Sequence, residues 1–285
     1  MTAVGLALLA AALLGTLPLL IRAGLARTPE RALAAFFQNG VAFLICGAVA
    51  VASGAFGGDP VPFLLIGLLV PGLMQLMFVW AVALAGPARV AVLINASPLL
   101  SVVLAWSLLG EPFHPGLLVG CVLIVLGSLA LVSERKRPSH VMRAGLVLAR
   151  AIALCFAARD NLVRHYATHT RVHPIMAAAL VLGAGTAFAA LAVAAERRSD
   201  IRRRLRTSAA AFWPVGAALG LAYLCSFEAY YRGRVSVVAP LIGMASLFSV
   251  ALSALLLRRV EGIGSHVLVG AALVVCGGGM IAVFR

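Results

Sequence analysis

Charged residues are scarce in this chain. Only 11% of its 285 residues are charged and nine are acidic, whereas 63% are hydrophobic and the mean hydropathy is +1.07. A soluble domain carries about 25% charged and roughly 45–50% apolar residues. The composition therefore excludes an ordinary soluble domain and predicts an integral membrane protein whose surroundings are a lipid bilayer.

Several functional motifs are also missing. The chain has no Walker sequence for binding ATP, so direct ATP drive is not expected. Its five cysteines fall within apolar runs without CxxC spacing, which is typical of small packing residues and not of disulfides or metal ligands. The alternating pattern of a membrane β-barrel is absent as well. We therefore expect an all-α integral membrane protein without a metal or a cofactor.

The formal net charge is +14, which raises the question of nucleic-acid binding. The basic residues lie mostly in short connectors between apolar runs, where the positive-inside rule places them. No stretch is long enough to fold as a soluble domain that could present a basic face. Nucleic acid is therefore not an expected partner.

Apolar runs of about 20 residues recur along the chain, each long enough to cross a hydrocarbon core about 30 Å thick as a helix. The first run lacks a basic start and is longer than the apolar region of a signal peptide, so we interpret it as a spanning helix. We predict ten transmembrane helices, at residues 3–21, 32–53, 61–84, 88–109, 115–133, 145–166, 174–195, 209–229, 235–257 and 264–284.

The two halves of the chain resemble each other. The segments EPFHPGLLVGCVLIVLG (111–127) and EGIGSHVLVGAALVVCG (261–277) match in Glu, Leu-Val-Gly and a second Gly at a constant offset, and ARVAV (88–92) matches GRVSV (233–237). A repeat of five spans is odd, so the second copy enters the membrane from the opposite side, as in many secondary transporters. We predict two inverted five-helix repeats, with domains at 1–138 and 139–285.

Residues 95–113 (NASPLLSVVLAWSLLGEPF) and 237–263 resemble the fourth and ninth helices of the ten-helix EamA-type members of the drug/metabolite transporter superfamily. Residues 156–166 (FAARDNLVRHY) resemble the sixth-helix segment of that family. Residues 13–24 take the place of its first-helix Trp-Gly-Ser-Asn-Phe pattern but lack the Trp and the Asn. The resemblance covers essentially the whole chain. It implies transport of amino acids, drugs, sugars or other metabolites and says little about which.

The distribution of arginine and lysine predicts an orientation. Sixteen basic residues lie in one set of connectors and five in the other set, which includes the termini. By the positive-inside rule, both termini lie outside the cytoplasm of a cell whose inner membrane the protein spans. The family resemblance implies the reverse, and we favour the charges.

Arg159, Asp160 and Asn161 lie within the predicted span 145–166. A charge near the centre of a span costs about 2.5–3.5 kcal/mol, so it faces the protein interior or a wet cavity. Arg159 and Asp160 point about 100° apart on a helix and are not expected to pair. Arg164, four residues on, can reach Asp160 or extend to the headgroups. Either Asp160 and Asn161 line a central cavity, or an Asp160–Arg164 pair only stabilises the helix end.

Glu228 is a second carboxylate within an apolar run. It can carry a coupling proton, as Asp160 can, or it can be an interfacial residue paired with Arg232 beside Tyr230 and Tyr231. Four further residues can either pack between helices or line the cavity. With Arg159, Asp160 and Asn161 they complete the predicted substrate-binding set: Gln75, Asn95, Tyr223 and Trp80.

Other residues suggest hinges, caps or a weak metal site. Pro98 and Pro240 lie in corresponding spans of the two halves and suggest hinges. Glu111 and Glu261 are expected to be structural, capping the fifth and tenth helices. The residues His165, His169 and His173 are four apart and could share a metal if they were helical. Pro174 follows, so we expect the helix to end before His173 and favour an interfacial loop.

The leading interpretation is a monomeric secondary transporter that moves small metabolites by alternating access, in the export direction. One alternative is a flippase for a lipid-linked headgroup, which needs a lateral opening and a cavity with basic residues such as Arg159. A membrane-embedded enzyme is a remote alternative, because only the weak histidine series could serve as a catalytic group. A sensor or partner subunit that does not transport is equally remote. We expect no enzyme activity.

Overall fold

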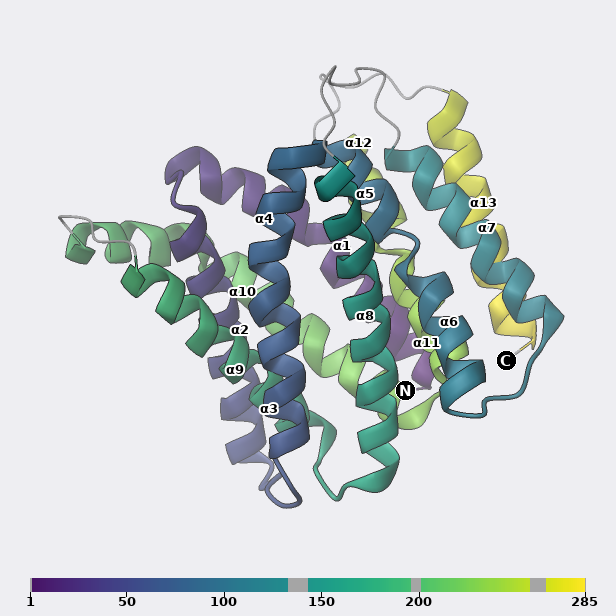
Figure 1. Cartoon of the computed structure of the whole chain (residues 1–285), viewed down its shortest axis with the longest axis horizontal. Coiled ribbons are helices and arrows are strands. Elements are labelled where there is room, and N and C mark those ends of the chain that lie inside the picture. Colours follow the sequence, from purple (N-terminus) through teal and green to yellow (C-terminus); the bar gives the residue numbers. More distant parts are fainter. Residues whose placement is uncertain (1, 133–142, 196–200, 257–264, 285) are drawn as a thin grey trace.

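The computed structural model describes residues 2–132, 143–195, 201–256 and 265–284. These ranges contain helices and short connectors and no strand (Figure 1). The helices of the first half are α1 (Ala3–Arg27), α2 (Arg31–Ala52), α3 (Val61–Gly67), the π-helical turn η1 (Leu68–Leu73), α4 (Met74–Ala85), α5 (Pro87–Ile94), α6 (Ser97–Leu108) and α7 (Pro115–Val132). Those of the second half are α8 (Arg143–His169), α9 (Pro174–Ala195), α10 (Ile201–Arg232), α11 (Val235–Gly243), α12 (Ala245–Leu256) and α13 (Ser265–Phe284).

These helices form the ten predicted spans. In the described part of the chain, eight stretches are long and apolar enough to cross a membrane, and Pro115–Leu131 is a shorter apolar helix. The remaining helix, α8, forms the sixth span; it has 27 residues, five of them charged. The chain is therefore a multi-pass, all-helical membrane protein. In Figure 1 the ends marked N and C lie in the same half of the bundle, as an even number of passes requires.

Three spans are broken near prolines. The third passes through η1 around Pro71, and the fourth is interrupted at Asn95 and Ala96, just before Pro98. The ninth is interrupted at Met244, four residues after Pro240. A proline has no backbone N–H and removes one hydrogen bond of the helix ladder, so breaks concentrate near it. The breaks near Pro98 and Pro240 stand at the positions where we predicted hinges.

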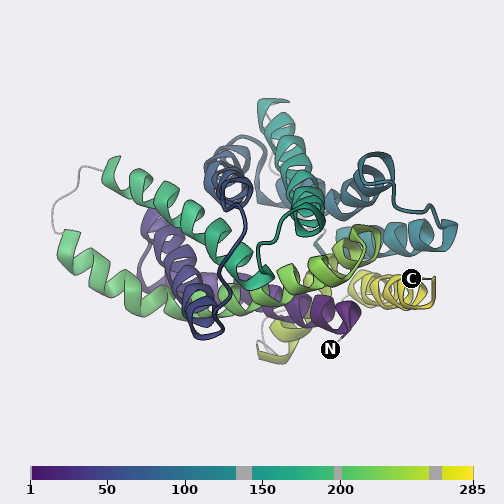
Figure 2. The same cartoon turned by 90° about the horizontal axis from the view of Figure 1, so that it is seen from below.

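The helix contacts follow a pseudo-twofold arrangement. Corresponding spans of the two halves pack together, α2 with α9, α7 with α13 and α6 with α11. Contacts between spans that do not correspond come in related pairs. The first span of the first half (α1) packs on the third span of the second half (α10), and the first span of the second half (α8) packs on the third span of the first half (α4). Figure 2 shows α7 and α13 side by side at one edge and α2, α9 and α10 at the other. The predicted two-repeat architecture is thus confirmed.

Glycines of the sequence repeat allow α7 and α13 to touch. A Cβ added to Gly127 would lie 2.6 Å from the carbonyl oxygen of Gly270, and one added to Gly277 would lie 2.5 Å from that of Gly120. Such distances leave no space for any side chain. The matching glycines that revealed the repeat therefore sit face to face at its axis, where small residues let helices pack closely in lipid.

Glu111 caps a helix of the other repeat. Its Oε1 accepts a hydrogen bond from the N–H of Val235 at 2.7 Å, and its Oε2 accepts from the N–H and the Oγ of Ser236 at 3.0 and 2.5 Å. These groups begin α11, whose own N-cap residue, Arg234, makes no side-chain cap bond. The structural role predicted for Glu111 holds, but the expectation that it caps the fifth helix is wrong. Glu261 lies outside the described residues.

Glu111→Gln is expected to lower the free energy of unfolding by about 1–2 kcal/mol, because the amide keeps one acceptor and loses the charge that complements the start of α11. Thermal unfolding of the detergent-solubilised protein measures this. The matched control is Glu228→Gln, which breaks a pair with the half-exposed Arg232 and should cost less than about 0.5 kcal/mol. Equal effects of the two substitutions would contradict the cap.

Candidate functional site

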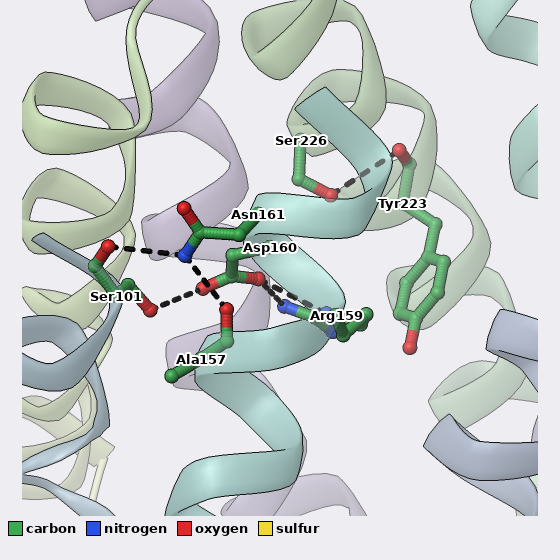
Figure 3. Close-up of polar contacts among 7 residues, drawn as sticks. All are labelled: Ser101, Ala157, Arg159, Asp160, Asn161, Tyr223 and Ser226. Atoms are coloured by element: carbon green, nitrogen blue, oxygen red, sulfur yellow. Dashed lines mark hydrogen bonds and ion pairs between the residues drawn. The ribbon is translucent and has the colours of Figure 1, made fainter. Parts of the chain in front are cut away.

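Asp160 is a buried residue of α8 and lies where this helix meets α6. The residue is only 7% exposed. Its Oδ2 accepts a hydrogen bond of 3.0 Å from the Oγ of Ser101, a fully buried residue of α6 (Figure 3). The carboxylate therefore bridges the two repeats, because α6 belongs to the first half of the chain and α8 to the second.

Arg159 is the counter-ion of Asp160. Its Nε and Nη2 donate to Oδ1 of Asp160 at 3.0 and 2.6 Å, and the two side chains are 14% and 9% exposed. The expectation that these sequence neighbours do not pair is wrong. The angle between adjacent Cβ directions is large, but the arginine side chain is long enough to fold back along the helix surface. Pairing offsets the cost of placing both charges within the membrane.

Arg164 does not bind Asp160, so the alternative of an Asp160–Arg164 pair is not what the structure has. Its Nη1 donates to the main-chain carbonyl oxygens of Tyr230 and Tyr231, at 3.0 and 2.9 Å. These carbonyls belong to the last turn of α10, which ends at Arg232 and so leaves its final acceptors without helical donors. Arg164 thus joins the end of α8 to the end of α10.

Asn161 completes the contact between α8 and α6. Its Nδ2 donates to the carbonyl oxygens of Ser101, at 3.0 Å, and Ala157, at 2.9 Å, while its Oδ1 is buried without a hydrogen-bond partner (Figure 3). A buried acceptor without a donor is costly. The Oδ1 of Asn161 is thus an acceptor beside the charged pair that could bind a donor from outside the protein.

Aromatic rings surround the guanidinium of Arg159. Its Cζ lies 5.4 Å from the centre of the Phe156 ring and 5.9 Å from that of Tyr223, distances at which a cation and a ring attract. Tyr223 in turn stacks on Phe227, with ring centres 5.7 Å apart. Tyr230 is 1% exposed and lies close to both charges of the pair. These rings give the ion pair an apolar wall.

The structure brings Tyr223 to the predicted site and leaves other candidates elsewhere. Trp80 is 63% exposed on α4, so it does not wall an enclosed cavity. Gln75 accepts a hydrogen bond of 3.4 Å from the buried Asn39, an interhelical use of both side chains. Asn95 is half-buried at the break between α5 and α6. Glu228 pairs with Arg232, which is the interfacial interpretation of this carboxylate.

Sequence reasoning missed three parts of the site: Ser101, Phe156 and Tyr230. Phe156 lies three residues before Arg159, on the same helix face, so helical spacing could have indicated it. Ser101 and Tyr230 belong to other helices, and no local pattern points to them.

Two cavities lie outside the ion pair. One, of about 470 Å³, is lined at the ends of α6 and α8 by residues that include Glu111, Arg164, His165, His169 and Arg234. The His165 and His169 rings stack there with centres 4.1 Å apart. The helix ends at His169, as expected, and among the described residues no three His, Cys, Asp or Glu side chains could hold a metal. The other cavity, of about 340 Å³, is apolar and lies between α1 and α12.

Comparison with known proteins supports the same architecture. A solved structure titled "Crystal structure of protein" has a TM-score of 0.79 to this chain at 23% identity and covers 99% of this chain and 98% of its own, which shows the shared fold. A search of curated proteins found no match. The model of the EamA-like transporter family matches twice, at residues 1–133 and 143–283. The chain therefore belongs to the EamA-like transporter family.

Proposed function

We propose that this protein is a secondary transporter that moves small metabolites across the membrane by alternating access, in the export direction. The observation that carries the proposal is the buried Arg159–Asp160 pair where α8 meets α6. In transporters built from inverted repeats, the substrate site lies near the midplane, between the repeats and beside broken helices. Here α6 is the second half of such a broken span.

The proposed site offers both signs of charge against an aromatic wall. An anionic group of a substrate can approach Arg159, and a cationic group can approach Asp160, each in competition with the internal pair. Phe156 and Tyr223 supply apolar surface beside the guanidinium. Asn161 adds an unpaired acceptor. This combination suits a small polar or charged metabolite with an apolar part.

We also propose Asp160, rather than Glu228, as the carboxylate that carries a coupling proton. Asp160 is buried and contacts the facing repeat through Ser101, so its charge state can affect both halves. Glu228 faces Arg232, a residue half-exposed at the end of α10. A proton bound there would not reach the contact between the repeats.

We propose that the protein works as a monomer in the inner membrane with both termini outside the cytoplasm. The orientation is supported by the concentration of arginine at the end of the bundle opposite the termini. The described residues there include Arg22, Arg27, Arg31, Arg143 and Arg203. The test is to treat intact cells that carry Thr2→Cys with an impermeant thiol reagent. We expect the introduced cysteine to be labelled. Protection of this cysteine would reverse the orientation.

A lipid flippase remains the second candidate, because the apolar cavity between α1 and α12 is bordered by the exposed Leu9 and Leu255. That cavity could take an acyl chain. However, its lining has only Thr16 as a polar side chain, and Arg159 is already neutralised by Asp160. The site for a charged headgroup that a flippase needs is therefore not at this cavity, and we prefer the metabolite.

The proposal is tested by a thermal-stability screen of the detergent-solubilised protein against amino acids, sugars, nucleosides and amphipathic cations. A ligand that binds the native state raises the melting temperature by mass action. We expect one class to stabilise the parent protein and Glu228→Gln, and to lose this effect in Asp160→Asn. Stabilisation by lipid-linked ligands alone would favour the flippase.

A further inference from the structure

The first helices of the two repeats, α1 and α8, can be aligned through their contacts. Near their starts, a Cβ on Gly233 would lie 2.8 Å from the Cβ of Ala3, and a Cβ on Gly145 would lie 2.8 Å from that of Ala85. These contacts join each helix to the end of α10 or α4, which are corresponding spans. By the offset between 88–92 and 233–237, Gly233 corresponds to Ala88, three residues from Ala85, so these contacts align Ala3 with Gly145 to within one helical turn.

A second pair of contacts near the other ends gives the same alignment, again to within one helical turn. Gly24 of α1 packs against the ring of Phe212 in α10, and Tyr166 of α8 packs against the ring of Phe63 in α3, with ring centres 6.3 Å apart. Gly24 and Tyr166 are separated by the same number of residues as Ala3 and Gly145. At this spacing, the counterpart of Arg164 is Arg22.

The two arginines have different surroundings. The guanidinium of Arg164 is part-buried and holds the carbonyls of Tyr230 and Tyr231, so α8 packs against α10. Arg22 is exposed. Within the part of the chain that the structure describes, α1 has no comparable packing against α3, η1 or α4, the span that corresponds to α10. The twofold relation is therefore broken at this contact.

Acceptors equivalent to the Tyr230 and Tyr231 carbonyls exist at the end of α4. The match between ARVAV (88–92) and GRVSV (233–237) makes Ala85 and Gly86 the counterparts of the two tyrosines. The helix α4 ends at Ala85, and Pro87 follows with no N–H to donate back into its last turn. The carbonyl oxygen of Gly86 accepts a hydrogen bond of 3.3 Å from the N–H of Val90 and keeps a second lone pair. The terminal carbonyls of α4 can therefore accept a guanidinium in addition, as those of α10 do.

We propose that Arg164 and Arg22 are reciprocal latches of the transport cycle. In the conformation described here, Arg164 holds the end of α8 against the end of α10, at the end of the bundle that carries the termini. In the opposite conformation Arg164 releases α10, and Arg22 binds the last carbonyls of α4 and closes the other end. The proposal deepens the proposed function and rests on it, since it assigns the two gates of alternating access.

Each latch is a set of hydrogen bonds from a charged donor, made in one conformation only. Removing it changes the ratio of the two conformations by about tenfold or more, because hydrogen bonds to charged groups contribute about 1.5–3 kcal/mol. The two single substitutions shift the ratio in opposite directions. The double substitution returns it toward the parent value, which a purely local effect on stability would not do.

The test measures spin-label distances at both ends of the protein in lipid nanodiscs. Labels are carried by introduced ketone-bearing residues, so the native cysteines stay in place. One pair of labels, at residues 168 and 234, spans the cavity between the ends of α8 and α11. The other pair, at the exposed residues Ala26 and Ala83, spans the ends of α1 and α4.

Arg164→Gln is expected to increase the long-distance population at 168/234 and the short-distance population at 26/83. Arg22→Gln is expected to do the reverse, and Arg164→Lys to give an intermediate shift, because the shorter lysine side chain keeps the charged donor but reaches the two carbonyls less well. The control is Arg150→Gln, which removes an exposed arginine of α8 and should change neither distribution. Single substitutions that affect only their own end, or neither end, would overturn the latches.

Substrate flux measured on the same variants separates this proposal from the proposed function. If the two single variants shift the distance distributions in opposite directions but no variant shows substrate flux, the latch proposal stands and the transport proposal is contradicted. Flux that survives with unchanged distance distributions in both single variants would keep transport and contradict the latches.

Discussion

Asp160→Asn is expected to lower the free energy of unfolding by about 3 kcal/mol. The substitution keeps the shape of the side chain and its contact with Ser101, but it leaves the guanidinium of Arg159 without a counter-ion in a site where the arginine side chain is only 14% exposed. Breaking a buried ion pair by removing one partner costs about 3–5 kcal/mol, and a low-polarity membrane interior offers little compensation. Chemical unfolding in detergent micelles measures the loss.

The double substitution Arg159→Gln with Asp160→Asn is the matched control. It removes both charges and leaves a pair of amides that can hydrogen bond with each other and with Ser101. Replacing a whole buried ion pair by neutral groups is often close to neutral, so we expect a loss below about 1 kcal/mol. If the double variant is as unstable as Asp160→Asn, the cost does not come from an uncompensated arginine, and our account of the pair is wrong.

Gly277→Val is expected to have the second largest effect on stability. The added Cβ would lie 2.5 Å from the carbonyl oxygen of Gly120 and 2.9 Å from the side chain of Ile124, so α13 must move away from α7. Forcing extra groups into a closely packed interface costs about 1–3 kcal/mol, and the shift also disturbs the facing pair Gly127 and Gly270. Thermal unfolding and the yield of folded protein both report the loss.

Gly279→Val provides the control on the same helix. A Cβ at this position meets nothing within 4 Å, so the valine side chain points into open space. Its effect should stay within about 0.5 kcal/mol. A comparable loss in both variants would show that valine itself, and not the approach of α7 to α13, destabilises this helix.

The spans and the repeat could be predicted because their signals are local in sequence. A run of apolar residues has to be helical and about 20 residues long to cross the membrane, whichever helices surround it. The repeated glycines at 120, 127, 270 and 277 were visible as letters before their contact was known. The sequence did not indicate why these glycines recur, which is that the backbones of α7 and α13 meet there.

The partners of charged residues could not be predicted in the same way. Helical spacing allowed Arg164 to reach Asp160, four residues away, or the headgroups, but Arg164 binds carbonyls of α10 that lie more than sixty residues along the chain. Glu111 likewise caps a helix of the other repeat. Both contacts depend on how the two halves interlock. Helical spacing describes only which residues share a face of one helix.

The central claim is that a small metabolite crosses the membrane through the site at Arg159 and Asp160. The most direct measurement is substrate counterflow in proteoliposomes, using the ligand class that stabilises the purified protein, with the parent, Asp160→Asn and Glu228→Gln. We predict exchange flux for the parent and for Glu228→Gln and its loss in Asp160→Asn, provided that each variant is folded in the vesicles. Undiminished flux in folded Asp160→Asn would contradict the assignment of this site, and no flux of any stabilising ligand in the parent would contradict transport itself.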